Sequence, residues 1–469
     1  MKTRITATAV AIVLASCKVG PDYKRPEVET PVAFKEQGDW QPAQPRDGVP
    51  RGDWWTMYGD AKLNELIARV DVSNQTIAAA EAQVRISAAL TDQARSGLWP
   101  TVNAQVTRTE SQPSGTTGPV IGNPTNKRII DSFPVSVSWE ADLWGRIRRQ
   151  IESGEASTQA SAADLVNARL SMQSTLATNY FQLRALDSQR RLLADSVAAF
   201  QKNLDLTRNR YNAGVVSRVD VAQAETQLNA ARAQYVDVAV QRAQLEHAIA
   251  VLMGVPASGF ALEPGELALT PPPVPSTGLP ADLLERRPDV AGAERRVAQA
   301  NANIGVAKAA FFPTATLNGT YGYQTSNPSV WFNAPSNFWS LGIGFALTLF
   351  DAGRRSAVSD QALATYDQTV AQYRGTVLQA FADVEDNLVA LRILEQEAAI
   401  QAETVRAAQQ SLDITQNQYK AGIASFLQVA ITQTALLNAQ TTFLAIHARR
   451  IGASVLLVKA LGGGWEEKK

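Results

Sequence analysis

The feature that most constrains the fold is a long internal duplication. One turn motif, Tyr-x-Ala-Gly-x-x-Ser, occurs at Tyr211, Gly214 and Ser217 and recurs 208 residues later at Tyr419, Gly422 and Ser425. We therefore predict two copies of one unit, residues 61–254 and 281–462. The proline-rich segment 255–280 between them cannot continue a helix and reads as a linker. Each copy is far longer than the repeats of solenoid proteins.

Each copy predicts a pair of unusually long helices. Residues 357–418 contain no proline and one glycine, Gly375, and Val370, Val377 and Val384 begin a stripe that recurs every seven residues. A sustained seven-residue period predicts helices that supercoil against neighbours. We expect helices at 146–210 and 218–254 in the first copy, and at 354–418 and 426–461 in the second. Periodicity alone would fit an ordinary coiled-coil scaffold.

Two shorter segments in each copy alternate apolar and polar residues, which is the period of a β-strand. We expect these strands at 101–111 and 131–143, and at 314–324 and 341–350. Alternating segments of about ten residues with aromatic ends are the weak signature of an outer-membrane barrel. A small soluble sheet is the alternative for any single hairpin. The matched placement in both copies favours the barrel.

Four strands in one chain cannot close a barrel, for which about eight is the minimum. An open sheet edge in lipid would leave backbone groups unpaired at several kcal/mol each. Several chains must then share one barrel, most simply with cyclic symmetry. Their helices would form a second, helical cylinder that continues into the periplasm. Beyond the N-terminal segment no run of 18 apolar residues occurs, so we expect no spanning helix.

The N-terminus has the pattern of a bacterial lipoprotein signal. A basic start and a short apolar stretch lead to the run Leu14–Cys17, which ends in the only cysteine of the chain. We expect residues 1–16 to be a signal peptide and Cys17 to carry a covalent lipid, because several acyl chains on one residue make a stable anchor. Lys18 after the cysteine favours the outer membrane. Residues 17–60 would be a lipidated, extended segment, and residues 463–469 a C-terminal tail.

Composition and motifs argue against several function classes. Lys plus Arg and Asp plus Glu both number 44, so bulk charge does not favour nucleic acid. His247 and His447 are each followed by Ala, which excludes the HExxH zinc motif, and no Gly-Lys dipeptide occurs for a phosphate loop. We therefore predict no enzyme, no metal and no cofactor other than the lipid. A passive export channel leads, and a lipid-anchored coiled-coil scaffold is the alternative.

Several motifs together carry a family resemblance. They are Cys17 with Gly20–Pro26, Trp139–Arg146, Tyr211–Thr226, Leu284–Val290, Ala310–Thr314 and Phe350–Arg354. With them the chain resembles the TolC superfamily, and more closely the OprM/NodT group of outer-membrane efflux lipoproteins. The resemblance implies a mainly α fold with a small β part, in which a homotrimer shares a twelve-stranded β-barrel and an α-helical barrel.

The same resemblance implies partners and a role. The partners would be a periplasmic adaptor protein, an inner-membrane pump of the RND class, and outer-membrane lipid. The role would be a passive exit duct that exports drugs or other small toxic compounds. The outer-membrane channel of a type I protein secretion system is the alternative among channels.

The two turns are the most informative candidate sites. Gly214 and Gly422 suit the left-handed conformation that ends a helix, and Ser217 and Ser425 suit the cap of the next one. The resemblance adds that these turns, with Tyr211 and Tyr419, form the closed periplasmic end and meet the adaptor.

We expect the gate among the side chains around both turns, where polar contacts would tie the turns shut. The candidates are Arg208, Arg210, Arg218, Asp220, Leu412, Asp413 and Gln416. Leu412 is the candidate apolar constriction. Gln428 stands across the repeat from Asp220, and Ile431 stands where some relatives carry Asp. Any carboxylate filter would therefore rest on Asp220 or Asp413.

Overall fold

The computed structural model describes residues 18–31, 33–35, 53–112, 114, 127–270, 272 and 286–463. The predicted signal peptide and Cys17 lie outside these residues. The chain divides into two compact units, each assembled from three stretches of sequence. Unit 1 is 1–27, 83–161 and 292–373, and unit 2 is 28–82, 162–291 and 374–469.

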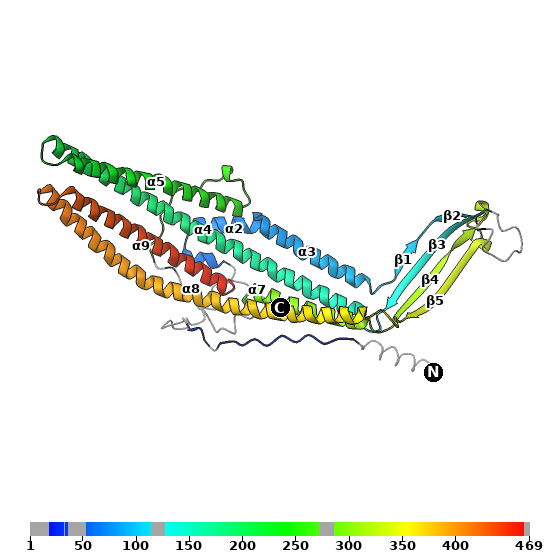
Figure 1. Ribbon diagram of the computed structural model, residues 1–469. Helices are drawn as coiled ribbons and strands as arrows, with labels where there is room; N and C mark the ends of the chain where they lie inside the picture. Colours follow the sequence, from blue (N-terminus) through cyan, green and yellow to red (C-terminus); the bar gives the residue numbers. More distant parts are fainter. Residues whose placement is uncertain are drawn as a thin grey trace. The chain divides into compact units, whose positions relative to one another are not determined.

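The chain is mainly helical with a small β part, as predicted (Figure 1). The helices are η2 (Trp54–Tyr58), α2 (Ala61–Ser73), α3 (Gln75–Ser96), α4 (Arg146–Asn212), α5 (Arg218–Leu252), η3 (Ala257–Gly259), α7 (Pro288–Ala309), η5 (Pro328–Val330), η6 (Ala334–Ser336), α8 (Arg354–Lys420) and α9 (Phe426–Ala460). The strands are β1 (Thr101–Ala104), β2 (Thr107–Ser111), β3 (Arg128–Ala141), β4 (Thr314–Thr325) and β5 (Asn337–Ala346). The long helices α4 and α8 each contain 67 residues.

The strands form one antiparallel sheet in unit 1, in the order β1-β3-β4-β5, with β2 also paired to β3. The predicted first strand is split into β1 and β2 because Pro134 of β3 lies opposite Gln105. The Gln105 N–H donates to the Pro134 carbonyl at 3.1 Å, but proline has no N–H to return the bond. β1 and β2 keep one register along β3, so they are one interrupted strand.

The prediction for β5 lies too far along the chain, because 341–350 was expected and Asn337–Ala346 is observed. Ala346 pairs with Thr314, the first residue of β4. The residue before it, Pro313, has no N–H, so the ladder ends there. Leu347–Phe350 therefore continue beyond the strand.

The register gives the sheet one apolar face and one polar face. Residues that share the apolar face are Val102, Val106, Phe133, Val135, Val137, Trp139, Leu317, Tyr321, Tyr323, Trp339, Leu341, Ile343 and Phe345. The alternate positions carry mostly Ser, Thr, Asn and Gly. On β5 the apolar side chains are uncovered, since Trp339, Leu341, Ile343 and Phe345 are 74%, 71%, 71% and 70% exposed. A soluble sheet would bury such a face against another layer.

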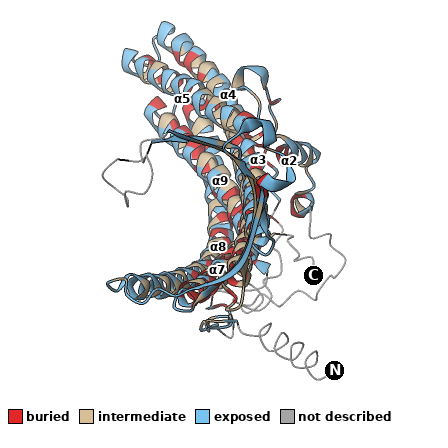
Figure 2. Cartoon of the chain, turned by 90° about the vertical axis from the view of Figure 1, so that its right-hand side faces the viewer, coloured by how far each residue is buried: buried red, intermediate tan, exposed pale blue. Residues whose placement is uncertain are grey.

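Unit 2 has its core where α2 meets the long helices. Leu63, Ile67 and Val70 of α2 are fully buried in a cluster with Leu176 of α4 and Val455 of α9. Figure 2 shows buried and exposed residues alternating along the long helices, as expected of helices that each bury one stripe.

Among the described residues α9 alone is long and apolar enough to cross a membrane by length and composition. The sequence of α9 contains no uninterrupted apolar run of 18 residues, because Thr, Gln and Asn interrupt the apolar positions. Half of the qualifying window is buried inside the protein, and Val455 and Leu457 are 0% exposed. We therefore interpret α9 as a core helix.

Candidate functional site at the two interhelical turns

Both turns end a long helix in the same way. Gly214 and Gly422 have positive φ angles of 74° and 79°, which side chains with a Cβ rarely adopt. After Gly214, the Val215 N–H donates to the Arg210 carbonyl at 2.8 Å, and after Gly422 the Ile423 N–H donates to the Gln418 carbonyl at 2.9 Å. These hydrogen bonds across five residues satisfy carbonyls in the last turns of α4 and α8.

The serines then start the next helices, each with a partner three residues on. The Ser217 N–H donates to Asp220 Oδ2 at 2.9 Å, and the Asp220 N–H donates to Ser217 Oγ at 3.4 Å. The Ser425 N–H donates to Gln428 Oε1 at 3.1 Å. Gln428 thus performs the capping role that Asp220 has in the first copy, which accounts for the exchange of Asp for Gln.

Tyr419 joins the two turns. Its side chain is 4% exposed and its hydroxyl lies 3.1 Å from Oγ1 of Thr207 on α4. The guanidinium carbon of Arg210 lies 4.6 Å from the centroid of the Tyr419 ring, and Nη1 of Arg210 donates to the Tyr419 carbonyl. Arg210 and Thr207 therefore hold the end of α4 to the end of α8. Tyr211, the repeat partner of Tyr419, is 40% exposed instead.

Three other charged gate candidates, Arg208, Asp220 and Asp413, make contacts within their own hairpins, and Arg218 is exposed. Nη2 of Arg208 donates to Glu225 Oε1 at 2.7 Å, and this bond lowers the pKa of the Glu225 carboxyl, with a smaller contribution from the charge of Arg218. Asp413 accepts from Gln409 on the same helix at 2.9 Å. These contacts and the cap on Asp220 lie within single hairpins, whereas Arg210 joins the two turns of the chain. The gating role of each of these residues stays a prediction.

Leu412, the candidate apolar constriction, packs among the helices of its own chain. It is 8% exposed and belongs to an apolar cluster with Phe200, Phe426 and Val429. Its role as an apolar constriction stays a prediction. Gln416 is half-buried.

Sequence reasoning missed Thr207, which is 0% exposed, and Glu225. Thr207 lies three residues after Leu204, which is buried in the same helix, and that spacing was the signal available for it. The pairing of Arg208 with Glu225 joins residues 17 apart across a hairpin, and no local pattern marks it.

The described residues offer little to support catalysis. They contain no group of three or more His, Cys, Asp or Glu side chains that would hold a metal ion. His447 packs against Phe443 with ring centroids 4.6 Å apart. Burial, and then the charge of Arg450, lower the pKa of its imidazole, which favours a neutral ring in the core.

Comparison with known proteins places these features in a family. A model of the family described as outer membrane efflux protein matches residues 66–255 and 279–463. The chain is 29% identical over 470 residues to the pyoverdine export outer membrane protein OpmQ of Pseudomonas aeruginosa, covering 99% of this chain and 98% of that protein. It is 30% identical over 479 residues to the toluene efflux pump outer membrane protein TtgF of Pseudomonas putida, covering 99% and 98%.

Solved structures give the same result for the fold. The outer-membrane channel OprN superposes with a TM-score of 0.87 at 27% identity, covering 96% of this chain and 100% of that chain. The open state of the MtrE outer membrane channel of Neisseria gonorrhoeae superposes with a TM-score of 0.79 at 27% identity, covering 96% and 98%.

Proposed function

Because this chain belongs to the outer membrane efflux protein family and is an outer-membrane efflux channel with a TolC-like fold, we propose that it works as a homotrimer. The family is one of efflux ducts and not of enzymes. Three copies would share one twelve-stranded β-barrel, with the interrupted strand β1–β2, β3, β4 and β5 contributed by each chain. The long helices of the three copies would form the α-helical barrel below it.

The observation that carries this proposal is the two-faced sheet. Its apolar face is uncovered on β5, and its two edges, the β1–β2 strand and β5, have no partner strand within the described part of the chain. Strands of 10 to 14 residues rise about 3.3 Å per residue, which suits a tilted crossing of the roughly 25 Å apolar band of an outer membrane. The copies supply the missing edge partners, and lipid covers the apolar face.

The polar face would then line the duct. Ser, Thr and Asn side chains, with the open backbone at Gly, offer a hydrated wall without a binding pocket, which suits passage of varied small compounds. Relatives named for pyoverdine export and toluene efflux support a small-molecule cargo.

We further propose two protein partners and one lipid anchor for this channel. A periplasmic adaptor protein would contact the turns at Tyr211–Ser217 and Tyr419–Ser425, and an inner-membrane RND-type pump would supply the energy. A lipid on Cys17 would add an anchor in the outer membrane.

The gate would depend on Arg210. It joins the two turns of one chain through the Tyr419 ring and carbonyl, so a movement of the α8–α9 hairpin relative to the α4–α5 hairpin must change this contact. Opening would therefore exchange the Arg210–Tyr419 contact for contacts with the adaptor.

Native mass spectrometry of protein extracted gently from outer membranes tests the assembly. We expect three chains, each heavier than the polypeptide from residue 17 by the mass of its acyl groups. A stable monomer in every mild detergent would contradict the shared barrel. Trimers without added lipid mass would contradict only the proposed lipidation of Cys17.

A further inference from the structure

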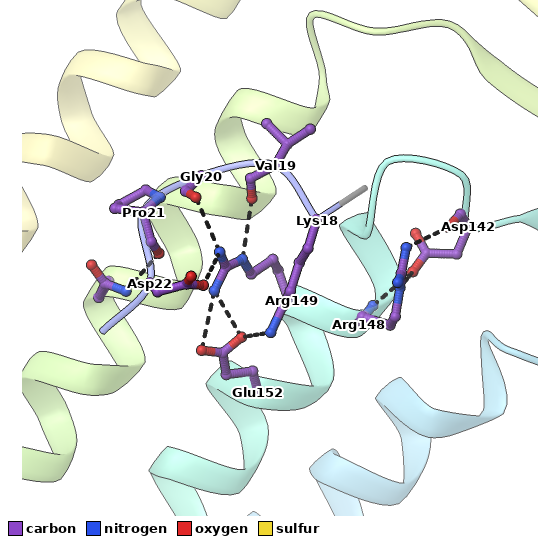
Figure 3. A network of polar contacts seen from close by, with 10 residues as sticks. Lys18, Val19, Gly20, Pro21, Asp22, Asp142, Arg148, Arg149 and Glu152 are labelled. Atoms are coloured by element: carbon purple, nitrogen blue, oxygen red, sulfur yellow. Dashed lines mark hydrogen bonds and ion pairs between the residues drawn. The ribbon is translucent and has the colours of Figure 1, made fainter. Parts of the chain in front are cut away.

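Arg149 is a charged side chain buried at the first turns of α4. It is 1% exposed, and its guanidinium points at the main chain of the N-terminal segment (Figure 3). Nε donates to the Val19 carbonyl at 3.1 Å, and Nη2 donates to the Gly20 carbonyl at 3.1 Å. A buried guanidinium is costly unless its donors are used, so these carbonyls are part of what makes its burial tolerable.

Carboxylates on both sides complete the environment of Arg149. Nη1 donates to Glu152 Oε2 at 3.0 Å, and Nη2 donates to Asp22 Oδ1 at 3.1 Å. Glu152 also pairs with the Lys18 ammonium. The N-terminal segment therefore supplies two carbonyls, one carboxylate and one ammonium to a single cluster with α4.

Two glycines allow the segment to lie this close. Gly20 has a φ of 100°, and a Cβ on it would lie 2.5 Å from the Cα of Gly305 on α7. A Cβ on Gly305 would lie 2.8 Å from Cγ of Arg149. Both distances are well below contact distance, so the fit of segment, α7 and Arg149 requires glycine at both positions.

Two further hydrogen bonds also involve the main chain of the N-terminal segment. The Val19 N–H donates to the Trp144 carbonyl at 3.1 Å, and Asn301 Nδ2 donates to the Pro21 carbonyl at 3.0 Å. We name the residues that hold the segment the Arg149 socket; they are Trp144, Arg149, Glu152, Asn301 and Gly305. Trp144, Arg149 and Glu152 belong to the first copy of the duplication, and Asn301 and Gly305 to the second.

Beyond the socket the segment continues across the second copy. The Tyr23 hydroxyl donates to Glu294 Oε1 at 3.1 Å, and Arg25 Nε donates to the Tyr373 hydroxyl at 3.3 Å. Burial and the charge of Glu294 raise the pKa of Tyr23, so the phenol stays a donor. The contacts thus extend from α4 to α7 and α8.

We propose that the Arg149 socket is a binding site for the main chain of residues 18–22, and that its occupation fastens the two copies together independently of any lipid. Val19 binds the Trp144 carbonyl between β3 and α4. The segment therefore leaves the socket at the strand–helix junction. For a chain acylated at Cys17, as proposed above, the socket would hold the anchor at this junction and so act as its positioning site.

Limited trypsin digestion of outer-membrane fragments tests the docking. Lys18 is a cleavage site inside the docked segment and Lys24 is one just beyond it, and a protease needs an undocked, extended chain. We expect Arg149→Met to speed cleavage at these sites about tenfold or more, since charged hydrogen bonds are among the stronger ones. Arg146→Met is the matched control, because Arg146 donates two hydrogen bonds to the Glu140 carboxylate of β3 and its loss should leave the rate unchanged.

Two further variants separate the socket from general damage and from the lipid. Gly305→Ala keeps every charge but fills the socket, and it should speed cleavage as well. Cys17→Ser behind an ordinary cleavable signal should leave the segment as protected as in the parent. Equal cleavage in Arg149→Met and the parent, equal acceleration by both arginine variants, or loss of protection in Cys17→Ser would overturn the proposal. Intact mass reports acylation separately, so a chain without lipid would refute only the anchor.

Discussion

A charge on the apolar face of β5 gives the sharpest test of the membrane barrel. Ile343 lies within Asn337–Ala346, pairs with Leu317, and is 71% exposed. In a lipid-facing sheet this position falls near the middle of the apolar band. Arg there costs about 2–4 kcal/mol per chain, and a shared barrel would incur that cost in every chain.

Ser340→Arg provides the control, because alternate residues of one strand point to opposite faces. It adds the same side chain to the polar face, where water would solvate it. We expect Ile343→Arg to lower the urea midpoint of the protein refolded into lipid vesicles and to reduce the assembled fraction in outer membranes. Ser340→Arg should change both by much less.

The scaffold alternative makes the opposite prediction. On a soluble sheet a largely exposed Ile is replaced by Arg with an effect within about 0.5 kcal/mol, and solubility would rise. An unchanged midpoint and normal assembly for Ile343→Arg would therefore refute the lipid-facing assignment of β5.

Three further outcomes follow from the helical part. Gly214→Ala should destabilise the protein in urea unfolding by about 1–2 kcal/mol through backbone strain alone, since φ is 74° and no atom lies within 4 Å of the added methyl. Gly259→Ala is the control, because that site is equally open but has no positive φ, and it should not destabilise the protein. Arg210→Met should raise single-channel conductance in planar bilayers because the contact with the second turn is lost, whereas Arg208→Met, which breaks an exposed pair, should not; equal traces would count against the gate. The pKa of His447 is lowered in the fold. As pH falls below about 6.5, the unfolded chain therefore takes up a proton before the folded chain does, and stability drops. In His447→Leu, the thermal unfolding midpoint should decrease less between about pH 7.5 and about pH 5 than it does in the parent.

Residues close together in the sequence determine much of the helical architecture. The stripe through Val370, Val377 and Val384 predicted a long helix, and α8 runs over Arg354–Lys420. Gly422 followed by Ser425 predicted a helix end and a new helix start, and the structure has both there. These signals are readable because helix period and capping depend on residues within a few positions of each other.

The sheet was predicted in kind but not in detail. Its alternation marks strands, yet the break at Gln105 depends on Pro134, and the end of β5 depends on Pro313. Each effect comes from the partner strand, whose register is a tertiary property. A strand read alone therefore cannot show where its ladder stops.

The same limit applied to the charged residues around the turns. Arg208, Arg210 and Asp220 look alike in the sequence as charges beside a turn. In the structure Arg210 contacts the second turn, Asp220 caps its own helix, and Arg208 pairs with Glu225. Which acceptor a long side chain reaches depends on helix packing and not on its neighbours in the chain.

The sequence by itself determined the duplication, the long helices and the glycine turns, since periodicity and turn chemistry are local. Only the tertiary structure decided the faces of the sheet, the joint between the two turns, and the socket of Arg149. In that socket Val19 and Gly305 both lie against the side chain of Arg149, although they are far apart in the chain. Contacts of this kind depend on how two copies pack, and no stretch of sequence encodes them alone.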